Sequence, residues 1–372
     1  MNSLKLSRFL LYIELLLFFL QHYSFALYEK IAYFNIITVF LYSFFISKTV
    51  KRSQIFSLIL VLSSIILFLL YNIFYIEHIG YGAIFFLLCF QLQYIILSNF
   101  EIKKDDYKYI ILLFICFLFL LDVDKMMSLG FNTNTISFVY LVCGIFSTLF
   151  LELNNKKNKI LFAIIVFTTT VGILNSESRT ALIAYWFYIL LLLYPSCFIR
   201  KKYLFLSINL FLTIGALLYV FIYIYMSKNL LDISDWFFTS KKDFFSGREI
   251  IWEETFNLFK LSPFIGIGSN INLRMTDSTS LHNSMLNLLF IYGILIFIPT
   301  IYILLKSLSN IWNYFDDKLI KKCIFAYWAF LIVSFSETCL FQECFICAFP
   351  LMIAYSRINS SCKISNSRKL YW

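Results

Sequence analysis

Three residues in the second half of the chain have side chains suited to phosphate binding and proton transfer. They are Arg179, Arg248 and His282. A guanidinium group binds phosphate oxygens through two parallel hydrogen bonds, and an imidazole can move a proton near neutral pH. If the three side chains lie together, they predict a site that binds a phosphorylated ligand and accepts a proton beside it.

Each of these residues also has a simpler interpretation. Arg179 follows Glu177 by two residues, so it could form a local ion pair or contact a lipid headgroup. Arg248 could be a solvated loop charge. His22 and His78 also fall near the ends of apolar runs, so a histidine in such a place is not rare in this chain. The hypothesis therefore depends on the three residues acting together.

Acidic residues give no sign of a bound metal. Glu337 lies near the end of one apolar run and Glu14 lies inside the first, and both are interpreted as buried, hydrogen-bonded acids. No group of acidic residues has the spacing of metal ligands. We therefore expect a metal-independent site without a cofactor.

The composition determines which elements must position these residues. Hydrophobic residues make up 61% of the 372 residues and charged residues 14%, which is more apolar surface than a soluble core can absorb. The 45 Phe and 25 Tyr against 10 Gly and 4 Pro argue against a β-barrel. The net charge of +10 does not indicate nucleic-acid binding, because the basic residues are spread among the ends of apolar runs.

The sequence thus predicts an all-α integral membrane protein, with one polytopic domain over residues 1–372. A bilayer core about 30 Å thick needs roughly 20 apolar residues per helical crossing, and such runs recur about 12 times. The predicted spans lie near 9–27, 31–47, 54–76, 79–99, 109–121, 136–153, 160–175, 180–199, 203–226, 283–305, 323–338 and 341–356.

The basic residues predict the orientation of these spans. With both termini cytoplasmic, 22 of the 31 Lys and Arg residues lie on the cytoplasmic side, and every short loop satisfies the positive-inside rule. Six of the other nine lie in one long polar loop, residues 227–282, between the ninth and tenth spans. We therefore expect this loop on the outer side, and long loops are usually functional.

An amphipathic helix is predicted within the long loop, over residues 248–260. Its apolar residues recur at helical spacing, and they are Ile251, Trp252, Phe256 and Phe259. Leu261-Ser262-Pro263 ends the helix, and Gly266 and Gly268 predict a turn. Two interpretations stay open: a helix that shields the bundle at the membrane surface, and one that carries catalytic residues.

These motifs resemble those of the O-antigen polymerase and O-antigen ligase superfamily, bacterial polytopic membrane glycosyltransferases. Four features carry the resemblance in order: the segment 176–180 opening a helix, Gly247-Arg248 followed by Trp252, the segment 263–268, and His282-Asn283 followed by Gly293. They cover residues of about 176–305, whereas the first 150 residues resemble only a generic membrane bundle. The usual second glycine after Gly293 is replaced by Ile294-Leu295-Ile296, a departure in helix packing.

The resemblance implies a GT-C-like helical glycosyltransferase with a lipid-accessible cleft beneath the outer loop. Its donor would be an oligosaccharide linked to undecaprenyl pyrophosphate, and Arg179 and Arg248 would hold the pyrophosphate. His282 would be the base for the acceptor hydroxyl or a further pyrophosphate contact. Glu177 and Glu253 are alternative bases, and Asn283 is a further substrate-binding candidate.

We expect, by this resemblance, a polymerase of O-antigen or capsule repeat units at the outer face of the bacterial inner membrane. A ligase that transfers the finished chain to lipid A-core is the closest alternative, and a flippase for lipid-linked sugar is the next. The expected partners are the lipid-linked oligosaccharide and membrane lipid, and a chain-length regulator protein is a candidate. A flippase would more often have broken helices, paired halves and short outer loops.

Overall fold

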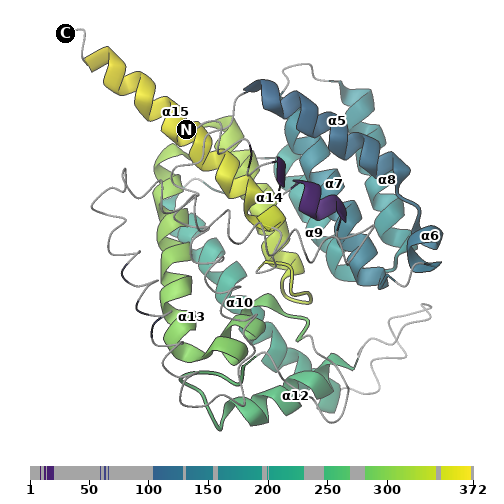
Figure 1. Ribbon diagram of the computed structural model, residues 1–372, viewed down its shortest axis with the longest axis vertical. Helices are drawn as coiled ribbons and strands as arrows, with labels where there is room; N and C mark the ends of the chain where they lie inside the picture. Colours follow the sequence, from purple (N-terminus) through teal and green to yellow (C-terminus); the bar gives the residue numbers. More distant parts are fainter. Residues whose placement is uncertain are drawn as a thin grey trace.

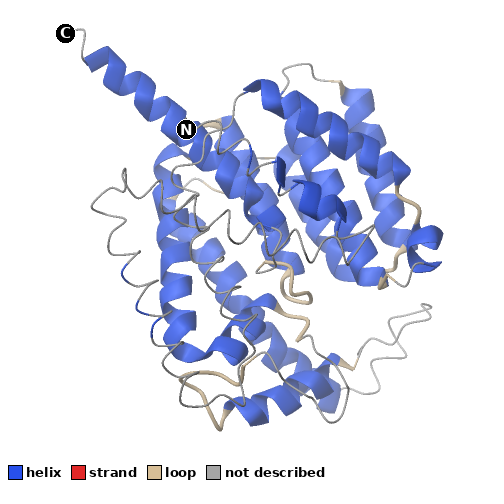
Figure 2. Cartoon of the chain, in the orientation of Figure 1, coloured by secondary structure: helices blue, strands red, loops and turns tan. Residues whose placement is uncertain are grey.

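The computed structural model describes residues 104–128, 131–153, 158–194, 199, 201–229, 247–268, 281–340 and 345–369, with a few more within 9–20 and 59–66. Every regular element in these ranges is a helix (Figure 2). The α-helices are α5 Lys104–Leu120, α6 Val123–Ser128, α7 Thr133–Leu153, α8 Lys159–Asn175, α9 Arg179–Leu193, α10 Lys202–Asn229, α12 Arg248–Phe259, α13 Ser284–Ile311, α14 Lys318–Val333 and α15 Phe349–Lys369.

The helices form two groups joined by α14 (Figure 1). In one group, α7 packs against α5, α8 and α9. In the other, α10 packs against α13, and the short helix α12 lies across both at one end of the bundle. Helix α14 contacts α9 and α7 in one group and α10 in the other, so it connects the two groups, and it also contacts α15.

The helical, apolar character of the prediction is confirmed. Helix α10 and the segment Ser284–Tyr314 are long and apolar enough to cross a membrane, whereas Thr133–Leu149, Lys159–Asn175 and Arg179–Leu193 are shorter apolar helices. The predicted spans 31–47 and 79–99 lie outside the described residues, as do most of 9–27 and 54–76. The count of twelve spans and their orientation stay predictions.

The surfaces of the apolar helices carry large apolar side chains. Phe167 on α8 is 70% exposed and Phe211 on α10 is 63% exposed, and both helices are also apolar on their buried sides. A helix that is apolar all round must face an apolar environment on every side. This surface is what a helix in contact with lipid requires.

A cap and a proline account for two of the differences between predicted and observed helix ends. Helix α14 begins at Lys318 because Asp317 accepts hydrogen bonds from the amides of Leu319 and Ile320, which brings two further lysines into the helix. Helix α9 ends at Leu193, earlier than the predicted span 180–199. Pro195 explains this end, since the residue before a proline disfavours the helical conformation.

Helix α13 is interrupted in its N-terminal half. Gly293 has φ 76° and ψ 174°, so the helical hydrogen bonds break there. The segment Pro263–Gly268, which follows α12, fills the break. Amides of Ile267 and Gly268 donate to the carbonyls of Phe290 and Ile291, at 2.8 and 3.1 Å.

The exchange of hydrogen bonds at this break runs in both directions. The amides of Ile294 and Leu295 donate to the carbonyls of Pro263 and Phe264, at 3.0 and 3.1 Å. A Cβ atom on Gly266 would lie 2.3 Å from the Ile291 carbonyl oxygen, and one on Gly293 would lie 2.3 Å from that of Phe264. Only glycine fits at either position, so the two glycines join the loop to the helix. The predicted turn at Gly266 is confirmed as part of this junction.

Candidate functional site

The predicted amphipathic helix is confirmed as α12, and it docks on the bundle. Its apolar side packs against α10 and α13, where Trp252 is fully buried beside Tyr223 and Phe290. The indole Nε1 of Trp252 donates to the carbonyl oxygen of Leu281 at 2.6 Å. The same contact that anchors α12 therefore fixes the backbone directly before His282.

Asn283 fixes the backbone on the other side of His282. Its Oδ1 accepts from the amide of Leu286 at 2.8 Å and so caps α13. Its Nδ2 donates to the carbonyls of Ala216 on α10 and Phe335 after α14, at 3.0 and 2.9 Å. Asn283 is fully buried and both of its amide protons are used, so it joins three helices. This arrangement supports a positioning role for Asn283 instead of direct substrate binding.

His282 adopts a backbone conformation that non-glycine residues rarely use. Its φ is 48°, and among the described residues only Glu177, with φ 54°, shares this feature without being glycine. Such a conformation costs about 1–3 kcal/mol and persists where the surroundings impose it, often at functional sites. Leu281 and Asn283 are both held by hydrogen bonds, so they impose it here.

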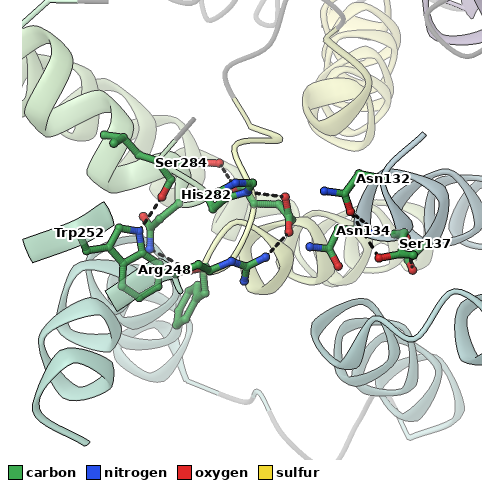
Figure 3. A network of polar contacts seen from close by, with 12 residues as sticks. Asn132, Asn134, Ser137, Arg248, Trp252, His282 and Ser284 are labelled. Carbon is green, nitrogen blue, oxygen red and sulfur yellow. Dashed lines mark hydrogen bonds and ion pairs between the residues drawn. The ribbon is translucent and has the colours of Figure 1, made fainter. Parts of the chain in front are cut away.

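One carboxylate brings Arg248 and His282 together (Figure 3). Nη2 of Arg248 donates to Oε1 of Glu337 at 2.8 Å, and Nδ1 of His282 lies 3.5 Å from Oε2 of the same carboxylate. The side chains of Arg248, His282 and Glu337 are 15%, 26% and 21% exposed, so solvent screens their charges only in part. The structure thus brings Arg248 and His282 together through Glu337, whereas a site at which all three predicted residues, Arg179 included, bind one ligand stays a prediction.

Arg179 approaches the same region from α9. It is the first residue of α9, which packs along α14, the helix that leads to Glu337. The charges of Arg179 and Arg248 both act on the hydroxyl group of Tyr219, on α10. The ring of Tyr219 packs against Trp252. Tyr219 therefore lies within the electrostatic reach of both arginines.

Both arginines occupy an unfavourable place in their helices. Arg179 and Arg248 are the first residues of α9 and α12, where the helix dipole favours negative charge. The N-cap residues, Ser178 and Gly247, make no side-chain hydrogen bond to their helices. A helix N-terminus with a guanidinium group beside it is suited to bind an anion such as phosphate.

The remaining predicted residues lie apart from this cluster. Glu253 forms an exposed ion pair with Lys228 at 2.6 Å. Glu177 is exposed in the turn before α9 and lines an open groove of about 950 Å³ that also includes Asp122 and Tyr140.

Glu337 is the residue that sequence reasoning missed. It was interpreted as a buried acid near the end of its span, whereas it lies in the turn after α14 and contacts both candidate residues. Its only signal in the sequence is an acid beside an apolar run, which does not reveal its partners. In the described ranges, no group of three His, Cys, Asp or Glu residues is placed to hold a metal ion.

Comparison with known proteins confirms the resemblance. Residues 163–301 match a family described as O-antigen ligase. This range contains Arg179, Arg248, His282 and the junction of Gly266 with Gly293. No curated protein and no solved structure matches the chain. The family match supports a membrane protein with a role in polysaccharide assembly.

Proposed function

Since residues 163–301 form a domain of the O-antigen ligase family, we propose that the chain is a membrane glycosyltransferase that polymerises polysaccharide repeat units. Its donor is an oligosaccharide linked to undecaprenyl pyrophosphate, and the reaction takes place at the outer face of the bacterial inner membrane. The chain crosses that membrane about 12 times with both termini cytoplasmic. A chain-length regulator protein is the expected partner.

One observation carries this proposal, namely the single carboxylate that joins Arg248 and His282. A cationic side chain for the leaving pyrophosphate lies beside a side chain that can accept the proton of an attacking hydroxyl. Electrostatic stabilisation of a leaving group and general-base catalysis are the two contributions that glycosyl transfer without a metal requires. Arg179 adds a second positive charge on the same side.

The reaction balances as follows. The oxygen of the acceptor hydroxyl bonds to the anomeric carbon of the donor, and the bond from that carbon to the pyrophosphate oxygen breaks. The hydroxyl proton passes to Nε2 of His282, because Nδ1 faces Glu337. The electron pair of the broken bond stays on undecaprenyl pyrophosphate, whose added charge is offset by Arg179 and Arg248.

The test is the banding of surface polysaccharide and lipid-linked sugar from a deletion strain. We expect the deletion to leave single repeat units, and the intact protein to restore a ladder of longer chains. Arg248→Ala should not restore it, since loss of one stabilising donor lowers such rates roughly 10²–10³-fold. Lys228→Ala is the matched control, because Lys228 also pairs with a glutamate at the outer end but is 55% exposed. It should restore the ladder.

Transfer of finished chains to lipid A-core is the second candidate, and the description of the matching family favours it. It predicts a different defect: long chains accumulate on undecaprenyl lipid and do not reach lipid A. That result would contradict the polymerase. A deletion that exports no repeat units at all would contradict both and indicate a flippase.

A further inference from the structure

Glu337 is held as firmly as the two residues it contacts. Its amide donates to the carbonyl of Val333 at 3.0 Å, in the turn that ends α14. Its carbonyl accepts from Oγ of Ser284, the first residue of α13, at 2.8 Å. The amide of Ser284 in turn donates to the carbonyl of Ser334 at 3.0 Å. The carboxylate therefore starts from a backbone tied to both helices.

The two oxygens of Glu337 have different partners. Oε1 accepts from Nη2 of Arg248, and Oε2 faces Nδ1 of His282. Arg248 already neutralises the carboxylate, so the contact with His282 is not needed to balance its charge. A guanidinium group has five N–H donors, and the contact with Glu337 uses only Nη2. Arg248 can therefore bind phosphate without releasing Glu337.

The orientation of His282 has a direct chemical consequence. If Nδ1 carries the proton and directs its N–H group at Oε2 of Glu337, the lone pair is on Nε2, on the other side of the ring. The distance of 3.5 Å is longer than a direct hydrogen bond, and such contacts often tighten only when substrate is bound. The carboxylate would also stabilise the imidazolium that forms when Nε2 takes a proton.

We propose that Glu337 is a positioning residue for the transfer reaction: it fixes the tautomer and orientation of His282 and holds Arg248 beside it. This inference rests on the proposed function. In the step concerned, the acceptor hydroxyl loses its proton to Nε2 as its oxygen bonds to the anomeric carbon. The pyrophosphate leaves with the electron pair of the broken bond. Glu337 keeps its charge throughout and does not touch the reacting atoms.

The test uses the full-length protein in proteoliposomes, with lipid-linked oligosaccharide extracted from the deletion strain as donor. Lipid A-core is supplied beside the lipid-linked acceptor, so that either transfer is detected. Glu337→Gln keeps the shape of the side chain but removes its charge. We expect kcat to fall roughly 100-fold, within the usual range for a general base, while KM for the donor changes less than about threefold.

Two further variants separate positioning from a purely structural role. Glu337→Asp keeps the carboxylate, and we expect it to retain kcat within about tenfold of the intact protein. Glu337→Gln combined with His282→Ala should be no slower than His282→Ala alone, because both changes disable one unit. Asp316→Asn, an exposed carboxylate at the other end of α14, is the control and should leave kcat unchanged.

The outcomes distinguish this inference from the proposed function. If the intact protein transfers sugar but Glu337→Gln has the same kcat, Glu337 has no positioning role. An increase in KM alone would overturn the inference as well, as would equal losses in the Asp and Gln variants. If Glu337→Gln does not fold, Glu337→Asp decides alone, and a loss of kcat of more than about tenfold in that variant overturns the inference. If the intact protein transfers sugar to neither acceptor, the proposed function itself fails.

Discussion

Helices α10 and α13 are both 28 residues long, pack against each other, and are built in different ways. Helix α10 is continuous, and a Cβ added at its central Gly215 would meet Phe211 at an ordinary contact distance. Helix α13 is broken at Gly293, and the segment Pro263–Gly268 supplies the missing hydrogen bonds. One helix is continuous, whereas the other also holds the segment that follows α12.

The difference shows how a polar loop is held rigidly against an apolar bundle. Unpaired backbone groups at membrane depth cost several kcal/mol each, so a break in a membrane helix must be filled. Here residues 263–268 fill the break. In the sequence, Arg248 precedes this segment and His282 follows it. The break in α13 therefore supports an anchored site rather than the ion path for which transporters use broken helices.

The largest effect is expected from Gly293→Ala. The added Cβ would lie 2.3 Å from the carbonyl oxygen of Phe264, and the positive φ disfavours any side chain. Strain of about 1–2 kcal/mol and overpacking of about 1–3 kcal/mol should lower the free energy of unfolding by about 2–5 kcal/mol. Thermal unfolding in nanodiscs and protease cleavage after α12 would measure this. Unchanged stability and cleavage would mean that the loop does not depend on the junction.

Gly266→Ala should come close behind, because its Cβ meets the carbonyl oxygen of Ile291 across the same junction. The variant with both alanines sharpens the comparison. Once one clash has displaced the segment, the second clash no longer arises, so the double variant should lose less stability than the sum of the two. Additive losses would show that each glycine acts independently of the junction.

Asn283→Ala tests the tie between the two helices themselves. It removes the α13 cap and the hydrogen bonds to Ala216 on α10 and Phe335, for an expected loss of about 2–3 kcal/mol. Asn283→Ser is the matched variant, since its hydroxyl oxygen can still accept the capping hydrogen bond while the two amide donors are lost. Thermal unfolding should place it between the intact protein and Asn283→Ala. Equal stability of the two variants would mean that the cap contributes nothing.

Local signals let much of the fold be predicted from the sequence. Apolar runs predicted most of the described helices, and the spacing of Ile251, Trp252, Phe256 and Phe259 predicted α12 within one residue. The short helix α6 was not predicted, and α15 begins and ends later than the predicted span 341–356. The junction could not be foreseen, because it joins main chain to main chain and Gly266 and Gly293 lie far apart in the sequence.

For the candidate site, too, the sequence predicted individual residues but not how they are placed relative to one another. Arg248 and His282 were predictable because charge at the ends of apolar helices is costly and needs a reason. Their relative placement was not, since it depends on Glu337, which lies in the turn after α14, 89 positions after Arg248. Glu253 resembled a candidate by its nearness to Arg248, but its side chain lies in an exposed pair with Lys228. Nearness in sequence does not show which side of a helix faces the site.

The smallest effect is expected from Gly215→Ala, the counterpart of Gly293→Ala in the continuous helix. The new Cβ would lie 3.5 Å from the Phe211 ring, an ordinary contact. Alanine is favoured over glycine inside a helix by about 0.5–1 kcal/mol, so stability should be unchanged or slightly increased. Thermal unfolding beside Gly293→Ala would measure both. A large loss at Gly215 would mean that glycine is required by helix packing in general, and the special role of the α13 junction would then have to be abandoned.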